Sequence, residues 1–142
     1  MALKKTKLLD ITSVTGIATV GIYTAGLTNT AVGVGTTSYV KSVIMHNTGL
    51  GTARVSLYVN PNTTSAARVA TGYGVTANRI LRVDVAPNET TFFETTYPIV
   101  LAPFNAISVE VNTPDAGGAG IGSMVNFIIN GDTDSPLSLI HI

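Results

Sequence analysis

The sequence predicts an all-β protein, a single antiparallel β-sandwich or jelly-roll-like domain with an extended arm at each end. Three observations predict this class. Thr, Val, Ala, Gly, Asn and Ile dominate the composition, and β-branched side chains suit the pleat of a strand better than a helix. Several segments alternate apolar and polar residues with a period of two, and none has a sustained period of 3.6. Clusters of Pro, Asn and Gly separate these segments, as turns do in sandwiches.

The individual strands are predicted from apolar residues at alternate positions. Ala53–Val59, Leu81–Val85 and Ile107–Asn112 alternate cleanly, which predicts one buried face and one wetter face for each strand. Tyr39–His46 and Met124–Ile129 are apolar on both faces. Each of these two is therefore expected to be a central strand, or a strand whose outer face meets another subunit. Weaker alternation predicts four further strands at Leu8–Ser13, Thr19–Thr24, Thr91–Glu94 and Ile99–Leu101.

The chain is predicted to form one domain. Its 142 residues are a typical length for a single hydrophobic core, and no internal repeat or linker divides them. We expect residues 1–7 to form an N-terminal arm, residues 8–131 to form the sandwich, and residues 132–142 to form a C-terminal arm.

Residues that could perform chemistry are few. There is no cysteine, which excludes disulfides, thiolate catalysis and cysteine-bound zinc. The histidines are His46, on an apolar strand, and His141, and no serine lies in a G-x-S-x-G elbow. Asp84 and Glu110 fall on the outward phase of their strands, as solvated carboxylates do. The run from Asp132 to Asp134 lacks the spacing of a calcium loop and predicts a polar turn. The sequence therefore predicts no enzyme activity, no cofactor and no metal.

The charge content predicts the kinds of partner. Eight basic and eight acidic side chains cancel, and charged residues make up 11% of the chain, against about 25% in an average domain. We expect no direct nucleic-acid binding, because the chain has no basic footprint. We expect no membrane span, since no apolar run approaches ~20 residues. We expect no signal peptide, since Asp10 directly interrupts the apolar start at Leu8 and Leu9. A surface with so little charge resists association poorly, so we expect neighbouring subunits to cover much of it.

Five short motifs follow one another in a fixed order between residues 39 and 131. They are a long strand ending in His-Asn-Thr, a V-x-L-Y strand, a P-x-x-[ST] turn, a P-I-V-L segment and an I-x-V strand. They lie at His46–Thr48, Val55–Val59, Pro87–Thr90, Pro98–Leu101 and Ile107–Val109. This order, over about two-thirds of the chain, resembles a recurrent kind of small tailed-bacteriophage virion protein. One departure is that the turn after P-I-V-L usually carries Gly-Asp, whereas this chain has Pro-Phe-Asn.

The resemblance implies a β-sandwich used as a building block of a virion. We expect a capsid decoration (cement) protein that stabilises the phage head by burying area between major capsid subunits. A small sandwich at a local three-fold axis is expected to form a homotrimer. The expected location is the virion, assembled in the host cytoplasm. A neck, tail or fibre protein is the alternative within this class. A carbohydrate- or receptor-binding module is the alternative from another class, and the absence of tryptophan and the 6% aromatic content count against it.

The residues expected to contact other subunits lie in the arms and in loops. Three lysines and two leucines form the basic-to-apolar start of the chain, and four aliphatic residues alternate near its end. Such an end favours addition to the edge of a sheet, either in its own sandwich or in a neighbour's. Two aromatic residues in predicted loops complete the set. The predicted interface residues are Lys4, Lys5, Lys7, Leu8, Leu9, Tyr73, Phe104, Leu137, Leu139, Ile140 and Ile142.

Overall fold

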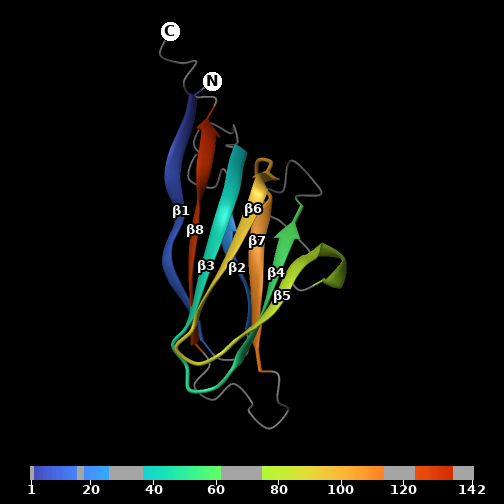
Figure 1. Cartoon of the computed structure of the whole chain (residues 1–142). Coiled ribbons are helices and arrows are strands. Elements are labelled where there is room, and N and C mark those ends of the chain that lie inside the picture. Colours follow the sequence, from blue (N-terminus) through green and yellow to red (C-terminus); the bar gives the residue numbers. More distant parts are fainter. Residues whose placement is uncertain (1, 16–17, 26–36, 62–74, 114–123, 136–142) are drawn as a thin grey trace.

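The computed structural model describes residues 2–15, 18–25, 37–61, 75–113 and 124–135, which form eight strands and one short 3-10 helix (Figure 1). Each strand is rich in β-branched or aromatic residues, as the pleat favours. In chain order the elements are β1 (Ala2–Thr15), β2 (Ala18–Thr24), β3 (Thr37–Asn47), β4 (Ala53–Asn60), η2 (Thr76–Asn78), β5 (Arg79–Val85), β6 (Thr90–Leu101), β7 (Ala106–Asn112) and β8 (Met124–Ser135).

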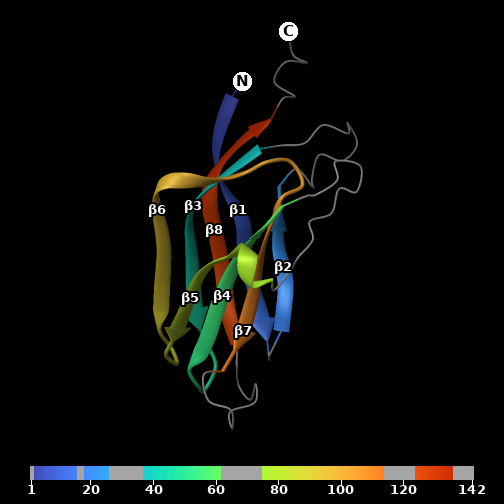
Figure 2. The same ribbon diagram turned by 90° about the vertical axis from the view of Figure 1, so that its right-hand side faces the viewer.

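The strands form two antiparallel four-stranded sheets that pack face to face (Figures 1 and 2). The first sheet has the order β1-β8-β3-β6, and the second has the order β2-β7-β4-β5. The pairs β1–β8, β2–β7, β3–β6 and β4–β5 are nested like the two arms of one long folded hairpin. This nesting of eight strands in two sheets is the jelly-roll arrangement. The predicted all-β sandwich is confirmed.

The core lies between the sheets and is built from the alternate residues that the sequence marks as apolar. β3 lies between β8 and β6, and β8 lies between β1 and β3, so the prediction that these two segments are central strands is confirmed. The largest side chains with no exposed surface in this layer come from both sheets. Among them are Phe127, Met45, Leu57, Leu101, Ile107, Ile129, Val43, Val55, Val85 and Val109.

The side chains on the outer face of β4 are less exposed to solvent than the alternation of the strand predicts. Ser56 and Tyr58 point away from the core and are nevertheless buried. β4 is an interior strand, so its outward side chains lie between those of β5 and β7. The Tyr58 hydroxyl donates to Glu110 on β7 over 3.4 Å, and the Ser108 hydroxyl donates to the side-chain oxygen of Asn60 over 2.6 Å. These hydrogen bonds satisfy polar groups that would otherwise be costly to bury.

Strands reach into both segments that were predicted as arms, residues 1–7 and 132–142. β1 runs without interruption from Ala2 to Thr15, and its first residues pair with the last residues of β8, from Ala2 opposite Ser135 to Lys7 opposite Asn130. Residues 132–135 are therefore part of a strand that lies between β1 and β3. At this end of the sheet β8 pairs with β1 as far as Ser135 and with β3 as far as Asp134, which lies opposite Thr37. Backbone hydrogen bonds along this ladder hold the described residues at both ends of the chain in the first sheet.

The prediction of a polar turn at Asp132–Asp134 is wrong, since both aspartates lie within β8. The ammonium group of Lys41 lies 2.9 Å from one carboxylate oxygen of Asp132, Oδ2, and forms an ion pair with it. The other oxygen, Asp132 Oδ1, and Asp134 Oδ1 are buried without a hydrogen-bond partner. No third acidic or histidine side chain joins them within the part of the chain that the structure describes.

Candidate interaction surface

The outer face of the first sheet carries a row of apolar side chains that crosses all four strands. Ile44 on β3 lies opposite Ile128 on β8 and opposite Phe92 on β6. Ile11 lies in a bulge of β1 that faces Ile128, because two residues of β1 oppose this one residue of β8. Ile11 and Phe92 are each 61% exposed, and the two central isoleucines are half-buried. We call these four residues the apolar row.

A row of polar side chains borders the apolar row on one side. It consists of hydroxyl, amide and imidazole groups and carries two hydrogen bonds. Ser13 Oγ donates to Asn126 Oδ1 over 2.5 Å, and His46 Nδ1 lies 2.7 Å from the hydroxyl of Thr90. Each of these hydrogen bonds joins an edge strand to its neighbour within one chain. The members, from β1 to β6, are Ser13, Asn126, His46 and Thr90.

A third row borders the apolar row on the other side and has a charge at each end. Lys7 on β1 lies opposite Asn130, and Glu94 on β6 lies opposite Ser42. Asn130 and Ser42 face each other in the middle. The ammonium group of Lys7 lies 3.3 Å from the carboxylate of Asp10. We call this the charged row, because it has a lysine, paired with Asp10, at one edge of the sheet and a glutamate at the other.

The edge strand β6 is interrupted by a bulge next to this face. The residues from Thr95 to Pro98 oppose a single residue of β3, Lys41. β6 bends sharply as it passes from the first sheet toward β7 (Figure 2). Tyr97 is 83% exposed, and Val100 beyond the bend is also exposed. A proline and a bulge at an edge hinder pairing with a foreign strand, so this edge is protected against β-strand addition.

The lysines predicted as interface residues lie on β1. Lys4 and Lys5 are placed by register opposite Thr133 and Asp132 of β8. Lys7 is exposed and lies on the outer face. The pKa of the neighbouring Asp10 carboxyl is lowered, first by the backbone N–H of Ile11 that donates to it and then by Lys7.

Three of the predicted contact residues are turned toward the protein's own interior. Leu8 and Leu9 are half-buried and pack against the core. Phe104 is only 7% exposed, because a left-handed backbone at φ 67° turns it inward. Its N–H donates to the carbonyl of Ala25 over 2.8 Å. The remaining predicted residues, Tyr73, Leu137, Leu139, Ile140 and Ile142, lie outside the described residues.

Sequence reasoning missed the exposed residues of the apolar row. Phe92 and Phe93 are adjacent, and the alternation of β6 sends one outward and the other toward the core. That phase could have marked Phe92 as an exposed aromatic. Nothing in the alternation marks Ile11 or Tyr97, because each lies in or beside a bulge that shifts the phase of its strand.

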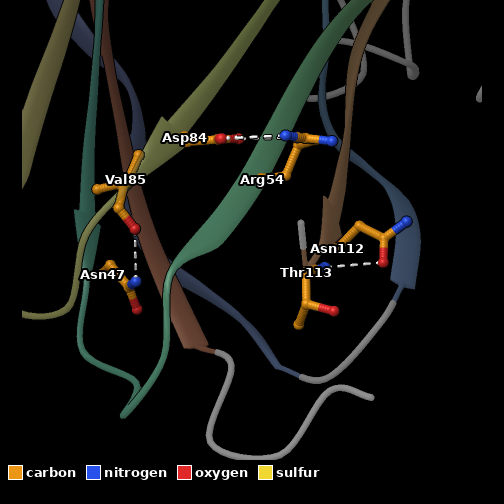
Figure 3. A network of polar contacts seen from close by, with 6 residues as sticks. All are labelled: Asn47, Arg54, Asp84, Val85, Asn112 and Thr113. Atoms are coloured by element: carbon orange, nitrogen blue, oxygen red, sulfur yellow. Dashed lines mark hydrogen bonds and ion pairs between the residues drawn. The ribbon is translucent and has the colours of Figure 1, made fainter. Parts of the chain in front are cut away.

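The His-Asn-Thr motif at the end of β3 has a structural role. The side-chain amide of Asn47 donates to the carbonyl of Val85 over 2.9 Å (Figure 3). It also donates to the carbonyl of Gly51 over 2.8 Å, and its oxygen accepts the N–H of Gly49 over 2.8 Å. Asn47 is completely buried. The N–H of Thr48 donates to the carbonyl of Met124 over 2.8 Å. The motif therefore fixes the β3–β4 turn to β5 and to the start of β8.

The second sheet carries an ion pair on its outer face. The guanidinium group of Arg54 on β4 holds both oxygens of Asp84 on β5, at 2.8 and 3.1 Å (Figure 3). This hydrogen bonding lowers the pKa of the Asp84 carboxyl. With Arg82 and Val83 the pair lines an open hollow of about 440 Å³. As predicted, Asp84 is exposed to solvent. Among the described residues, the lining consists of these four side chains.

Comparisons with protein families, with curated proteins and with solved structures find no match. Within the described part of the chain, no three histidine or acidic side chains gather in a way that could hold a metal ion. No helix among the described residues has the length and apolar character needed to cross a membrane. The apolar row is a contiguous set of exposed and half-buried apolar side chains that crosses all four strands of the first sheet.

Proposed function

We propose that this chain is a non-enzymatic structural subunit of a tailed-phage virion, most specifically a capsid decoration (cement) protein. The observation that carries the proposal is the apolar row on the outer face of the first sheet, where Ile11 and Phe92 are largely exposed. Large exposed apolar side chains in a contiguous row are typical of protein interaction surfaces. The low charge of the chain and the order of its motifs support the same class of function.

The fold supports the proposal by analogy. Jelly rolls occur in viral capsid proteins, and they occur also in lectins and in cupins. A fold shared by such different proteins does not decide a function by itself. The argument for a structural subunit therefore depends on the surface, which offers area for contact and, in the described residues, no assembled catalytic group.

A decoration protein would act by adding contact area between neighbouring subunits of the head. Each Å² of apolar surface removed from water contributes roughly 25 cal/mol. Internal pressure must then break these contacts in addition to those between the major capsid subunits. In this proposal the partners are major capsid or other virion subunits together with further copies of this chain, with a trimer at local three-fold positions.

The test is co-sedimentation of the purified chain with heads of a tailed phage assembled without it. We expect the chain to sediment with the heads and to raise the temperature at which they release DNA. Phe92→Lys, on the first sheet, should lose most of this binding. The matched control is Ile80→Lys, which makes the same change at an exposed residue of β5 in the second sheet and should keep it. Wild-type chain that stays in the supernatant would contradict the proposal.

Tyr97 favours a second candidate, the carbohydrate- or receptor-binding module. Its ring is 83% exposed on the β6 bulge, and an exposed aromatic face is what sugar-binding sites commonly present. Retention on immobilised glycans, lost in Tyr97→Ala and kept in Phe92→Lys, would support this candidate. The same variants tested against heads separate the two functions, because the decoration protein depends on Phe92.

A further inference from the structure

The apolar row is nearly symmetric about the middle of the first sheet. One large exposed apolar residue lies at each edge strand, Ile11 on β1 and Phe92 on β6, and one half-buried isoleucine lies on each central strand. We infer that a second copy of this chain covers this face, related to the first by a two-fold axis that runs along the strands between β8 and β3.

This axis matches apolar groups with apolar groups. A rotation of 180° about it exchanges β8 with β3 and β1 with β6, and it keeps each row at its own height along the strands. Ile44 of one copy then meets Ile128 of the other, and Ile11 meets Phe92. Because one patch serves both subunits, the contact is isologous and closes as a dimer without leading to a filament.

The same axis also matches the charges. In the charged row, Lys7 is at the β1 edge and Glu94 at the β6 edge, and the exchange of edges brings Lys7 of each copy, which also pairs with Asp10 of its own chain, to Glu94 of the other. The two-fold operation makes this ion pair twice. A two-fold axis that runs across the strands instead would put β1 against β1, with Lys7 near the polar row and Glu94 without an opposite charge.

The geometry of sheet packing fits this axis, and the area sets the strength of the contact. Sandwiched sheets cross at about 30°, which results when the strands of each copy tilt about 15° from the axis. Four strands spaced about 4.8 Å apart and five residues along each give a face of roughly 19 by 17 Å. The area of this face is well below the ~800 Å² that each partner buries in a standard interface. The dimer is therefore weak and depends on concentration.

The inference concerns the free chain and does not rest on a role in a virion, because a head and a second copy would compete for the same apolar row. If other surfaces also hold a trimer, the two-fold contact joins trimers in pairs. The assemblies that it produces are in either case even-numbered.

The test is sedimentation velocity over a wide range of protein concentration. We expect a monomer–dimer equilibrium, or a trimer–hexamer one, in the wild type and in the second-sheet control Ile80→Lys, and loss of the larger species in Phe92→Lys. A monomer or a trimer without any even-numbered species at high concentration would overturn the inference. Circular dichroism melting of each variant verifies that the sandwich remains folded.

Charge reversal tests the direction of the axis. Lys7→Glu and Glu94→Lys should each weaken the dimer about tenfold, because two attractive pairs become repulsive. The double variant should return to within about threefold of the wild-type dissociation constant. A double variant as weak as the single variants would refute this axis even if dimers form. Head binding without dimers would refute only this inference, and dimers without head binding would refute only the proposed function.

Discussion

Replacing Asn47 by alanine removes a side chain that connects three segments at one end of the sandwich. The amide of Asn47 donates to the carbonyls of Gly51 and Val85, and its oxygen accepts the N–H of Gly49. The backbone hydrogen bonds of Asn47, to the carbonyl of Glu89 and from the N–H of Asn88, do not involve the side chain and should survive. The substitution therefore isolates three side-chain hydrogen bonds at a completely buried position.

The expected cost follows from those three bonds. A protein hydrogen bond contributes about 1 kcal/mol net, and a buried group left without a partner costs about 1–3 kcal/mol. Water can reach the two partly buried partners, Gly49 and Gly51, but not the bond to Val85, which is buried. We therefore expect Asn47→Ala to lower the free energy of unfolding by about 3 kcal/mol, out of the roughly 5–15 kcal/mol of a typical domain.

The assay is urea unfolding followed by circular dichroism, with the slope of the transition checked for two-state behaviour. Asn47→Asp should be at least as destabilising, because a carboxylate keeps the acceptor for Gly49 but turns an oxygen toward two carbonyls. The matched control is Asn112→Ala, which removes a single local bond from the N–H of Thr113 and should cost less than about 1 kcal/mol. A loss below about 1 kcal/mol for Asn47→Ala, at an unchanged slope, would refute the assignment of a structural role to the motif.

Three further predictions concern single contacts. A Cβ at Gly131 would collide with the backbone oxygen of Tyr39, so Gly131→Ala should cost at least about 2 kcal/mol in urea unfolding and shift the β8 amide signals in NMR spectra. Tyr23→Phe removes the hydroxyl bond to Ser38 that joins the two sheets over 2.7 Å, so we expect a loss of about 1–2 kcal/mol, part of which returns when Ser38→Ala is added. Asp84→Asn should cost less than about 1 kcal/mol near neutral pH, because the pair is exposed. The folded-state pKa of Asp84 is lowered from 3.8, so the wild-type advantage is complete above that value and disappears as the pH falls through the lower folded pKa.

The sequence pattern was informative where a strand has regular alternation. The apolar phase of Ile107–Asn112 and of Leu81–Val85 predicts which residues face the core, because a strand turns successive side chains to opposite faces. The two-sided apolar character of Tyr39–His46 correctly predicts an interior strand. The nested pairing of the jelly roll was not predicted strand by strand, since register depends on contacts between residues far apart in sequence.

The candidate surface was predicted less well than the fold. The bulges that contain Ile11 and Tyr97 shift the phase of β1 and β6, and a bulge leaves no mark in a simple alternation. Phe104 was expected at the surface because it follows a proline in a turn, but its backbone conformation turns the ring inward. The chain ends were expected to be arms. A period-two pattern does not reveal that residues 2–7 pair with residues 130–135.

The central claim is that this chain is a structural component of a virion, and quantitative mass spectrometry of purified virions tests it most directly. The account predicts that the chain co-purifies with the particles, on the order of hundreds of copies per head, as repeated positions on a symmetric shell require. A small number of copies would move the chain to the neck, tail or fibre. Particles that contain none of it, from cells in which the chain is made, would contradict the account.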